Sequence, residues 1–348
     1  MNDELGALAA RVPAALRASV AYHVPQPPVV RAKLDANELP YGWPPELRAR
    51  LGAALAEVAL ERYPDPRARA LRGAVARVTG VGEDQITFGN GSDELIALVC
   101  AALAGPVLYP WPSFVYYRLS AIARGVPAIE VPLGDRFELD EAAFERAIAE
   151  HRPSVVFLAL PNNPTGTLWR MDFALELAGR HRDVAIVSDE AYLAYSGRTN
   201  LPALADHPNL IVMRTLSKVG LAGLRVGFTL SSPALAALLD KVRPPYNVSA
   251  LDQRAAVFAL DQAWSWCAAR AAEVVAERAR LARELARFGE VFPSEANLLL
   301  VRFARPGVAD ALAARGIAVR SFPFGTRITV GTPAETALLV AALDECAR

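Results

Sequence analysis

Short runs of apolar residues, most of them without polar alternation, recur along the middle of the chain. Seven such runs lie at 85–88, 106–109, 128–131, 155–160, 184–188, 210–214 and 224–230. A strand covered by helices on both faces has no exposed side, so its sequence lacks the alternation of a half-exposed strand. Helical stretches separate most of the runs. This βα alternation predicts an α/β fold with a largely parallel seven-stranded sheet between helices.

The pattern changes at both ends of the chain. After Lys241-Val-Arg-Pro-Pro, long helical stretches over 252–288 precede predicted strands at 297–303, 317–320 and 327–330. Proline clusters near the N-terminus indicate an extended arm, which a helical stretch over 46–60 follows. We therefore expect an N-terminal arm (1–45) that joins the small domain, a large domain (46–240) and a smaller α+β C-terminal domain (241–348).

One uncharged stretch, residues 95–117, resembles a membrane span. Gly105, Pro106, Pro110 and Pro112 interrupt it, whereas a spanning helix needs about twenty unbroken apolar residues. We predict buried core here and no membrane partner. The N-terminus lacks the basic start and apolar segment of a signal peptide, and the three cysteines are widely separated, so we expect a cytoplasmic protein.

The charges are balanced, with 37 basic and 37 acidic residues, and no run of basic residues exceeds a pair. Such a chain has no general positive field for a nucleic-acid backbone, so we expect individual groups to hold any anion. Only three basic residues are lysines: Lys33, Lys218 and Lys241. The four histidines lack the spacing of metal ligands, and we predict no metal site.

Polar side chains follow three successive predicted strands. Asn163 follows the strand at 155–160, Asp189 follows 184–188 and Lys218 follows 210–214. Spacings of 26 and 29 residues match the length of a strand, helix and strand unit. Because ligands of open parallel sheets bind beyond the carboxyl ends of the strands, we expect these three side chains to converge on one site.

An amine, a carboxylate and an amide in one cleft suit pyridoxal phosphate. A lysine forms an imine with a carbonyl group and an arginine does not, which makes Lys218 the candidate. Asp189 can keep the pyridine nitrogen of the cofactor protonated by charge pairing. Tyr192 and Asn163 can donate hydrogen bonds to the ring hydroxyl oxygen.

A glycine-rich turn, Gly89-Asn90-Gly91-Ser92, precedes a helical run and suits a phosphate group. Thr215, Ser217 and Arg225 can complete this phosphate site, and Phe114 can stack on the ring. Taken singly, each feature has a simpler explanation: a lysine in a loop, an aspartate that begins a helix, an ordinary turn, a core aromatic residue. Their joint occurrence, in order at consecutive strand ends, favours the cofactor site.

At this point the motifs resemble a known family. Fold-type I pyridoxal-phosphate aminotransferases have similar motifs to Asn162-Asn163-Pro164-Thr165-Gly166, Asp189-Glu190-Ala191-Tyr192, Ser217-Lys218 and Gly223-Leu224-Arg225. Further motifs are similar to those of the histidinol-phosphate aminotransferases within that family: Leu34-Asp35-Ala36-Asn37-Glu38, Arg62-Tyr63-Pro64-Asp65-Pro66, Gly91-Ser92-Asp93-Glu94, Arg214-Thr215-Leu216-Ser217-Lys218 and Gly325-Thr326-Arg327-Ile328-Thr329-Val330-Gly331-Thr332. The resemblance spans nearly the whole chain.

The resemblance implies a role for each matching residue. Lys218 would bind the cofactor as an imine, Asp189 would face the pyridine nitrogen, and Tyr192 and Asn163 would contact the ring oxygen. Residues implied at the cofactor phosphate are Gly91, Ser92, Thr215, Ser217 and Arg225, with Tyr63 from the second subunit of a homodimer. Residues implied at the substrate are Arg327 for its carboxylate, Arg320 and Tyr22 near its phosphate, and Asn37 over it.

The reaction implied by the resemblance transfers the amino group of glutamate to imidazole acetol phosphate, which gives 2-oxoglutarate and histidinol phosphate. The sequence departs from the family pattern at Leu39, at Val219 and in a short loop of six residues between Arg320 and Arg327. Two other enzymes on the same cofactor site stay open at this point, an aromatic amino-acid aminotransferase and a threonine-phosphate decarboxylase. A non-catalytic regulator is disfavoured by the neutral charge and the retained cofactor groups.

Overall fold

The computed structural model describes residues 6–19 and 27–347. Its larger part is built on a seven-stranded sheet in the order β2-β8-β7-β6-β5-β3-β4. The strands are β2 (Ile86–Asn90), β3 (Val107–Trp111), β4 (Ala128–Pro132), β5 (Val155–Ala159), β6 (Ala185–Asp189), β7 (Leu210–Thr215) and β8 (Val226–Ser231). The pairs among β7, β6, β5, β3 and β4 are parallel, and β8 is antiparallel to both of its neighbours. The predicted α/β fold with a mostly parallel sheet is confirmed.

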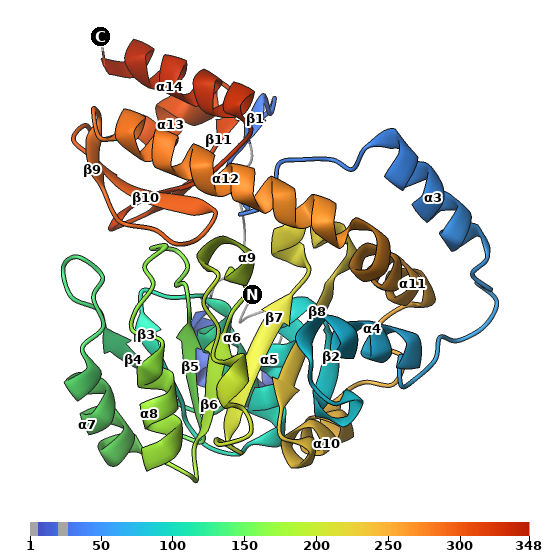
Figure 1. Cartoon of the computed structure of the whole chain (residues 1–348). Coiled ribbons are helices and arrows are strands. Elements are labelled where there is room, and N and C mark those ends of the chain that lie inside the picture. Colours follow the sequence, from blue (N-terminus) through green and yellow to red (C-terminus); the bar gives the residue numbers. More distant parts are fainter. Residues whose placement is uncertain (1–5, 20–26, 348) are drawn as a thin grey trace.

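Alternate residues of the central strands enter two separate hydrophobic cores. Val155 and Phe157 pack with helices α5 (Gly91–Ala102), α6 (Tyr116–Arg124) and α10 (Pro233–Val242). Val156 and Leu158 pack on the opposite face, with helices α4 (Arg69–Thr79), α7 (Glu141–His151), α8 (Asp172–Arg180) and α11 (Ala250–Phe258). Both faces of the strands are therefore apolar, which is why their sequences read as continuous hydrophobic runs. Figure 1 shows helices on the two sides of this sheet.

A second, smaller unit contains the C-terminal part of the chain (Figure 1). Its antiparallel sheet has the order β12-β13-β10-β9, from β9 (Gly289–Val291), β10 (Leu298–Phe303), β12 (Arg320–Phe322) and β13 (Gly325–Thr329). Helices α12 (Trp264–Leu285), α13 (Val308–Ala314) and α14 (Pro333–Ala347) pack on it. The predicted strand at 317–320 is divided in two, because β11 (Ile317–Ala318) and β12 belong to different sheets.

The N-terminal segment joins this smaller unit. Strand β1 (Ala32–Lys33) pairs in parallel with β11, and from there the chain crosses to α3 (Pro45–Ala56), which packs on α11. A π-helical turn at Ala259–Ala263 joins α11 to α12, so one continuous helical run connects the two units. The remaining α-helices among the described residues are α2 (Ala14–Ala18) and the short α9 (Leu193–Ser196). The predicted domain boundaries stay a prediction.

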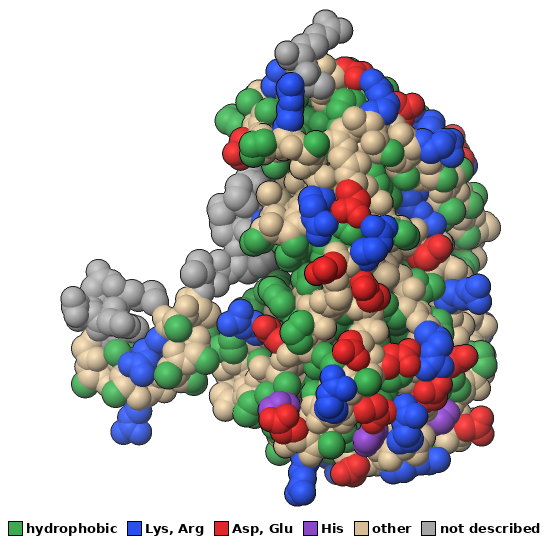
Figure 2. Space-filling view, turned by 90° about the vertical axis from the view of Figure 1, so that its left-hand side faces the viewer, with side chains coloured by type: hydrophobic (Ala, Val, Ile, Leu, Met, Phe, Trp, Pro, Cys, Tyr) green, Lys and Arg blue, Asp and Glu red, His purple; other side chains and the backbone are tan. Residues whose placement is uncertain are grey.

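The surface and the core agree with two further expectations. The uncharged stretch 95–117 forms most of α5, strand β3 and the start of α6, whose apolar side chains enter the core. Within residues 6–19 and 27–347, no helix is long and apolar enough to cross a bilayer. On the face shown in Figure 2, acidic and basic side chains are interspersed and no broad patch of one sign appears.

Candidate active site

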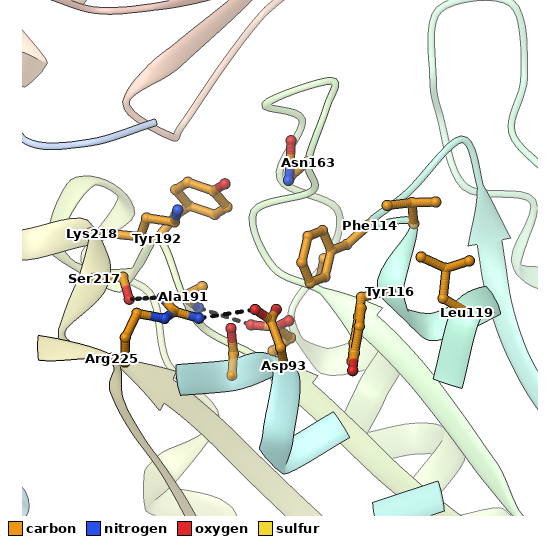
Figure 3. A pocket seen from close by; sticks show the side chains of 14 residues that line it. Asp93, Phe114, Tyr116, Leu119, Asn163, Ala191, Tyr192, Ser217, Lys218 and Arg225 are labelled. Atoms are coloured by element: carbon orange, nitrogen blue, oxygen red, sulfur yellow. Dashed lines mark hydrogen bonds and ion pairs between the residues drawn. The ribbon is translucent and has the colours of Figure 1, made fainter. Parts of the chain in front are cut away.

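A cavity of about 320 Å³ lies at the carboxyl ends of β5, β6 and β7 (Figure 3). Asn163, Asp189 and Lys218 all line it, so the predicted convergence of these three side chains is found in the structure. The other lining residues are Ser92, Asp93, Phe114, Val115, Tyr116, Leu119, Ala159, Ala191, Tyr192, Ser217 and Arg225. Lys218 and Tyr192 lie on one side of the cavity and Phe114 on the other (Figure 3).

Lys218 provides the amine of the site. It lies in a short 3-10 turn, Ser217–Val219, directly after β7, and its Nζ is 3.5 Å from the carbonyl oxygen of Ala36. Burial lowers the pKa of Lys218 to about 8, and the nearby charge of Arg327 acts in the same direction. Within the described part of the chain, carboxylates act on this amine through their charge and not through a side-chain hydrogen bond. A usable fraction of Lys218 is therefore neutral and nucleophilic near pH 7.

Asp189 ends β6 in a buried position, with only 5% of its surface exposed. Its Oδ2 accepts a hydrogen bond of 2.7 Å from the hydroxyl of Tyr117, and its Oδ1 accepts one of 3.1 Å from the N–H of Ala191. Burial raises the pKa of Asp189 to about 6, against the opposing effect of these two donors. A buried carboxylate with two neutral donors is suited to pair with a cation in the cavity.

Tyr117 is a site residue that the sequence analysis did not identify. Its side chain is fully buried in α6, where it stacks on Phe157 at 4.6 Å and meets the edge of Phe114 at 5.7 Å between ring centroids. It thus touches both the carboxylate and the aromatic ring that line the cavity. A tyrosine in an uncharged core stretch requires a partner for its hydroxyl, and this requirement is the signal that could have identified it.

The glycine-rich turn forms the start of α5. Gly91 has a φ of +77°, which favours glycine, and a Cβ added there would lie 2.5 Å from Nη2 of Arg225 and displace that guanidinium. The side chain of the N-cap residue, Asn90, makes no capping hydrogen bond to the first turn of α5, whose N–H groups and dipole suit an anion. Arg225 adds a positive charge beside this turn, and its Nη1 is 3.4 Å from Oγ of Ser217.

Two hydroxyl groups and one carboxylate surround this anion site. Thr215 donates to Oγ of Ser217 at 2.9 Å, although Thr215 itself does not line the cavity. Asp93 forms an ion pair of 3.0 Å with Nη2 of Arg225. Asp93 belongs to the motif Gly91-Ser92-Asp93-Glu94, which by itself predicts no role for this residue. Its partner is distant in sequence, so no local pattern could have revealed the pair.

The smaller unit and the N-terminal segment each supply a side chain that contacts a residue of the cavity wall. Arg327, on β13, donates a hydrogen bond of 2.7 Å from Nη1 to Oδ1 of Asn163. Asn37 donates one of 2.8 Å from Nδ2 to the hydroxyl oxygen of Tyr192. These two of the four predicted substrate residues therefore lie beside the two predicted partners of the ring oxygen.

Arg320 and Tyr63 are predicted site residues that lie away from this cavity. Arg320 lines a separate hollow of about 580 Å³ with Pro27, Pro28 and residues of α13, although its Cα pairs with that of Arg327 across β12 and β13. Tyr63 is 81% exposed and stacks on Tyr246 at 4.7 Å. Tyr22 lies outside the described residues. No cluster of potential metal ligands is found within the described ranges.

The residues present fit pyridoxal phosphate. An uncapped helix start, Arg225 and Ser217 suit a phosphate, a buried carboxylate suits a protonated ring nitrogen, and an amine of lowered pKa suits an aldehyde. Phe114 borders the space between these groups (Figure 3). The donor set thus offers one partner for each reactive part of the cofactor.

Comparisons with known proteins agree with this geometry. The family described as "Aminotransferase class I and II" matches residues 31–343. Histidinol-phosphate aminotransferase 1 of Burkholderia lata is 45% identical, with 89% of this chain and 91% of the relative covered. The histidinol-phosphate aminotransferase of Paracidovorax citrulli is 41% identical, with 99% of each chain covered.

A solved structure shows the same fold. It is that of the histidinol-phosphate aminotransferase from Sinorhizobium meliloti in complex with pyridoxal-5'-phosphate, with a TM-score of 0.81, 28% identity, and coverage of 91% of this chain and 90% of that one. The chain therefore belongs to the class I and II aminotransferase family and, within it, to the histidinol-phosphate aminotransferases.

Proposed function

We propose that this chain is a pyridoxal-phosphate-dependent aminotransferase that converts imidazole acetol phosphate and L-glutamate to L-histidinol phosphate and 2-oxoglutarate, a step of histidine biosynthesis. The observation that carries the proposal is the meeting of Lys218, Asp189 and Asn163 in one cavity. The identity to curated histidinol-phosphate aminotransferases supports the choice of substrates.

The cofactor would be held at four places. Lys218 would bind its aldehyde carbon, and Asp189 would pair with the ring nitrogen. Asn163 and Tyr192 would donate to the ring oxygen, and Phe114 would cover the ring. Gly91, Ser92, Thr215, Ser217 and Arg225 would hold the phosphate. When bound, pyridoxal phosphate supplies a conjugated ring that accepts the electron pair left when the substrate carbon loses its proton.

Lys218 is the residue that moves a proton. Its Nζ, with a pKa of about 8, exists in both protonation states near neutral pH. Once the amino group of the substrate has replaced Lys218 on the cofactor, the freed neutral amine would remove the proton from the substrate carbon, and the resulting ammonium would give that proton back on the way to product. Efficient general acid and base catalysis requires a pKa close to the working pH, and burial provides it here.

Arg327 would bind the anionic end of each substrate. This is the glutamate carboxylate in one half-reaction and the phosphate of the second substrate in the other. A planar guanidinium forms paired hydrogen bonds with either anion. Arg320 and Tyr22 would lie near the substrate phosphate, and Asn37 over the substrate. The two substrates would then bind in turn to one site, in ping-pong order.

The active form would be a homodimer located in the cytoplasm. Tyr63 lies away from the cavity of its own chain and is exposed with a stacked partner, Tyr246. An exposed aromatic pair of this kind is suited to an interface. In the dimer, the Tyr63 hydroxyl would reach the cofactor phosphate of the second subunit.

The experiment that tests this function is an absorbance titration of the purified protein. After pyridoxal phosphate is added and excess is removed, we expect a yellow band that changes when L-glutamate is added. Lys218→Ala should lack the band and Lys241→Ala should retain it. A wild-type protein that stays colourless would refute the cofactor assignment.

A turnover assay tests the substrate. Histidinol phosphate with 2-oxoglutarate should give glutamate faster than phenylalanine does. Release of carbon dioxide without amino transfer would contradict the proposed reaction and favour a decarboxylase.

A further inference from the structure

One hydrogen bond connects the N-terminal segment to the cavity wall. Nδ2 of Asn37 donates to the hydroxyl oxygen of Tyr192 at 2.8 Å. Both side chains are buried, Asn37 with 2% and Tyr192 with 4% of its surface exposed. Tyr192 lines the cavity beside Lys218, whose Nζ lies 5.9 Å from the tyrosine ring centroid. The bond is therefore made inside the site and away from bulk water.

The backbone of Asn37 is held in a conformation that suits asparagine. Its φ is +55°, in the left-handed region where asparagine is tolerated better than most residues. Its N–H donates to Oγ1 of Thr329 at 2.9 Å, and its carbonyl oxygen accepts from Nδ2 of Asn297 at 3.0 Å. Both partners belong to the smaller unit, so this unit holds Asn37 in place.

The same partners determine which way the amide of Asn37 faces. Oγ1 of Thr329 accepts the backbone N–H of Asn37 and donates its own hydrogen to Oδ1 of Asn37 at 3.1 Å. If the oxygen and nitrogen of the Asn37 side-chain amide exchanged places, the hydroxyl hydrogen of Thr329 would lose its acceptor among the described residues. Such a loss is costly for a buried hydroxyl. The oxygen of the amide therefore faces Thr329, and the NH₂ group faces Tyr192.

An NH₂ group donates and does not accept. The hydroxyl oxygen of Tyr192 accepts from Asn37, so the hydroxyl hydrogen of Tyr192 must point in another direction. We propose that Asn37 is a positioning residue that turns the Tyr192 hydroxyl so that its hydrogen is donated to the ring oxygen of the cofactor. This inference rests on the proposed function and adds to it, since Asn37 then acts on the cofactor through Tyr192.

The hydrogen bonds from Thr329 to Asn37 and from Asn37 to Tyr192 also connect the two units. Thr329 lies on β13 of the smaller unit, and Tyr192 follows β6 of the large sheet. The smaller unit therefore sets the direction of the Tyr192 hydroxyl through Asn37. Arg327, the proposed substrate arginine, lies two residues from Thr329 on the same strand.

The test measures the pH midpoint of the visible absorbance change of the cofactor-loaded protein. A hydrogen bond donated to the ring oxygen stabilises its ionised form, so loss of the bond raises the midpoint. Tyr192→Phe should raise it by about one unit or more. Asn37→Gly tolerates the positive φ and removes the amide, and it should raise the midpoint by a smaller amount, about half a unit.

The decisive comparison is the double variant. Asn37→Gly should add nothing in the Tyr192→Phe background, because the proposed effect passes through the hydroxyl. Thr329→Val should reproduce Asn37→Gly, and Thr329→Ser should restore the wild-type midpoint. Thr229→Val is the matched control, since the buried hydroxyl of Thr229 has no hydrogen-bond partner among the described residues. Thermal unfolding of each cofactor-free variant, and its dissociation constant for pyridoxal phosphate, show that it folds and binds.

An unchanged midpoint in Asn37→Gly, or a shift that persists fully in the Tyr192→Phe background, would overturn the proposal. An unchanged midpoint in Tyr192→Phe would overturn it as well. Failure of the wild-type protein to form the yellow band would instead refute the proposed function, so the two failures are distinguishable.

Discussion

The buried carboxylate of Asp189 should destabilise the cofactor-free protein, and Asp189→Asn tests this. The pKa of Asp189 is raised from an ordinary value of 3.8 to about 6. Between these values the native state binds more protons than the unfolded state. The free energy of unfolding therefore falls as the pH rises through this window. A shift of this size corresponds to about 3 kcal/mol between the low-pH and high-pH limits.

The assay is urea unfolding of the cofactor-free protein at pH 5 and pH 8. For a group with this shift, wild type should lose about 1.4 kcal/mol of stability between these two pH values, relative to Asp189→Asn. The difference between wild type and variant removes the contribution of all other titrating groups. The variant loses part of the hydrogen bonding at this site, with Tyr117 and Ala191, which changes its stability by a similar amount at both pH values.

Asp206→Asn, at an exposed position, is the control for an aspartate-to-asparagine substitution away from the site. A difference between wild type and Asp189→Asn that is the same at pH 5 and pH 8 would refute the reasoning. Asp189→Asn should also weaken cofactor binding, because a neutral amide cannot pair with a protonated ring nitrogen. The same carboxylate would then favour cofactor binding and oppose folding without the cofactor.

Three further predictions test other parts of the site. Tyr117→Phe removes a donor to Asp189 and should raise the pKa of Asp189 by about one unit. The pH range over which the free energy of unfolding falls should then move upward, and an unchanged range would contradict the prediction. Arg327→Ala should lower kcat/KM for glutamate and for histidinol phosphate alike, by about 100-fold or more, and loss for one substrate alone would refute a shared arginine. Mixing inactive Tyr63→Ala and Lys218→Ala subunits should restore activity, since a hybrid dimer would contain one intact site; no recovery would contradict a Tyr63 that acts across the interface.

The fold was predictable because burial on both sides leaves a clear signal in each strand. Strand β5 begins at the predicted residue and ends one residue earlier than predicted, and β7 extends one residue further. The antiparallel direction of β8 was not predictable, because an apolar run carries no information about direction. The division of 317–320 into β11 and β12 depends on pairing with β1 and β13, which are distant in sequence.

The site was predictable where its residues directly follow strands. Asn163, Asp189 and Lys218 are delivered to one edge by the sheet itself. Tyr117 and Asp93 lie on helices, and their partners, Asp189 and Arg225, are more than 70 residues away. Such contacts depend on how helices pack over the sheet, and a single sequence shows residue types but not this packing.

The charges of the site divide into two groups with different roles. Arg225 is paired with Asp93, and the buried Glu190 is paired with Arg214 at 3.0 Å. Thr199 and Asn200 also donate hydrogen bonds to Glu190. Lys218 and Asp189 form no ion pair within the described residues, and each has a pKa moved toward neutrality, to about 8 and about 6. Paired charges stabilise the geometry of a site, whereas unpaired buried charges destabilise the empty protein until a ligand compensates them. The aldehyde and the protonated ring nitrogen of pyridoxal phosphate would supply what these two groups lack, so the site is complete only with the cofactor bound.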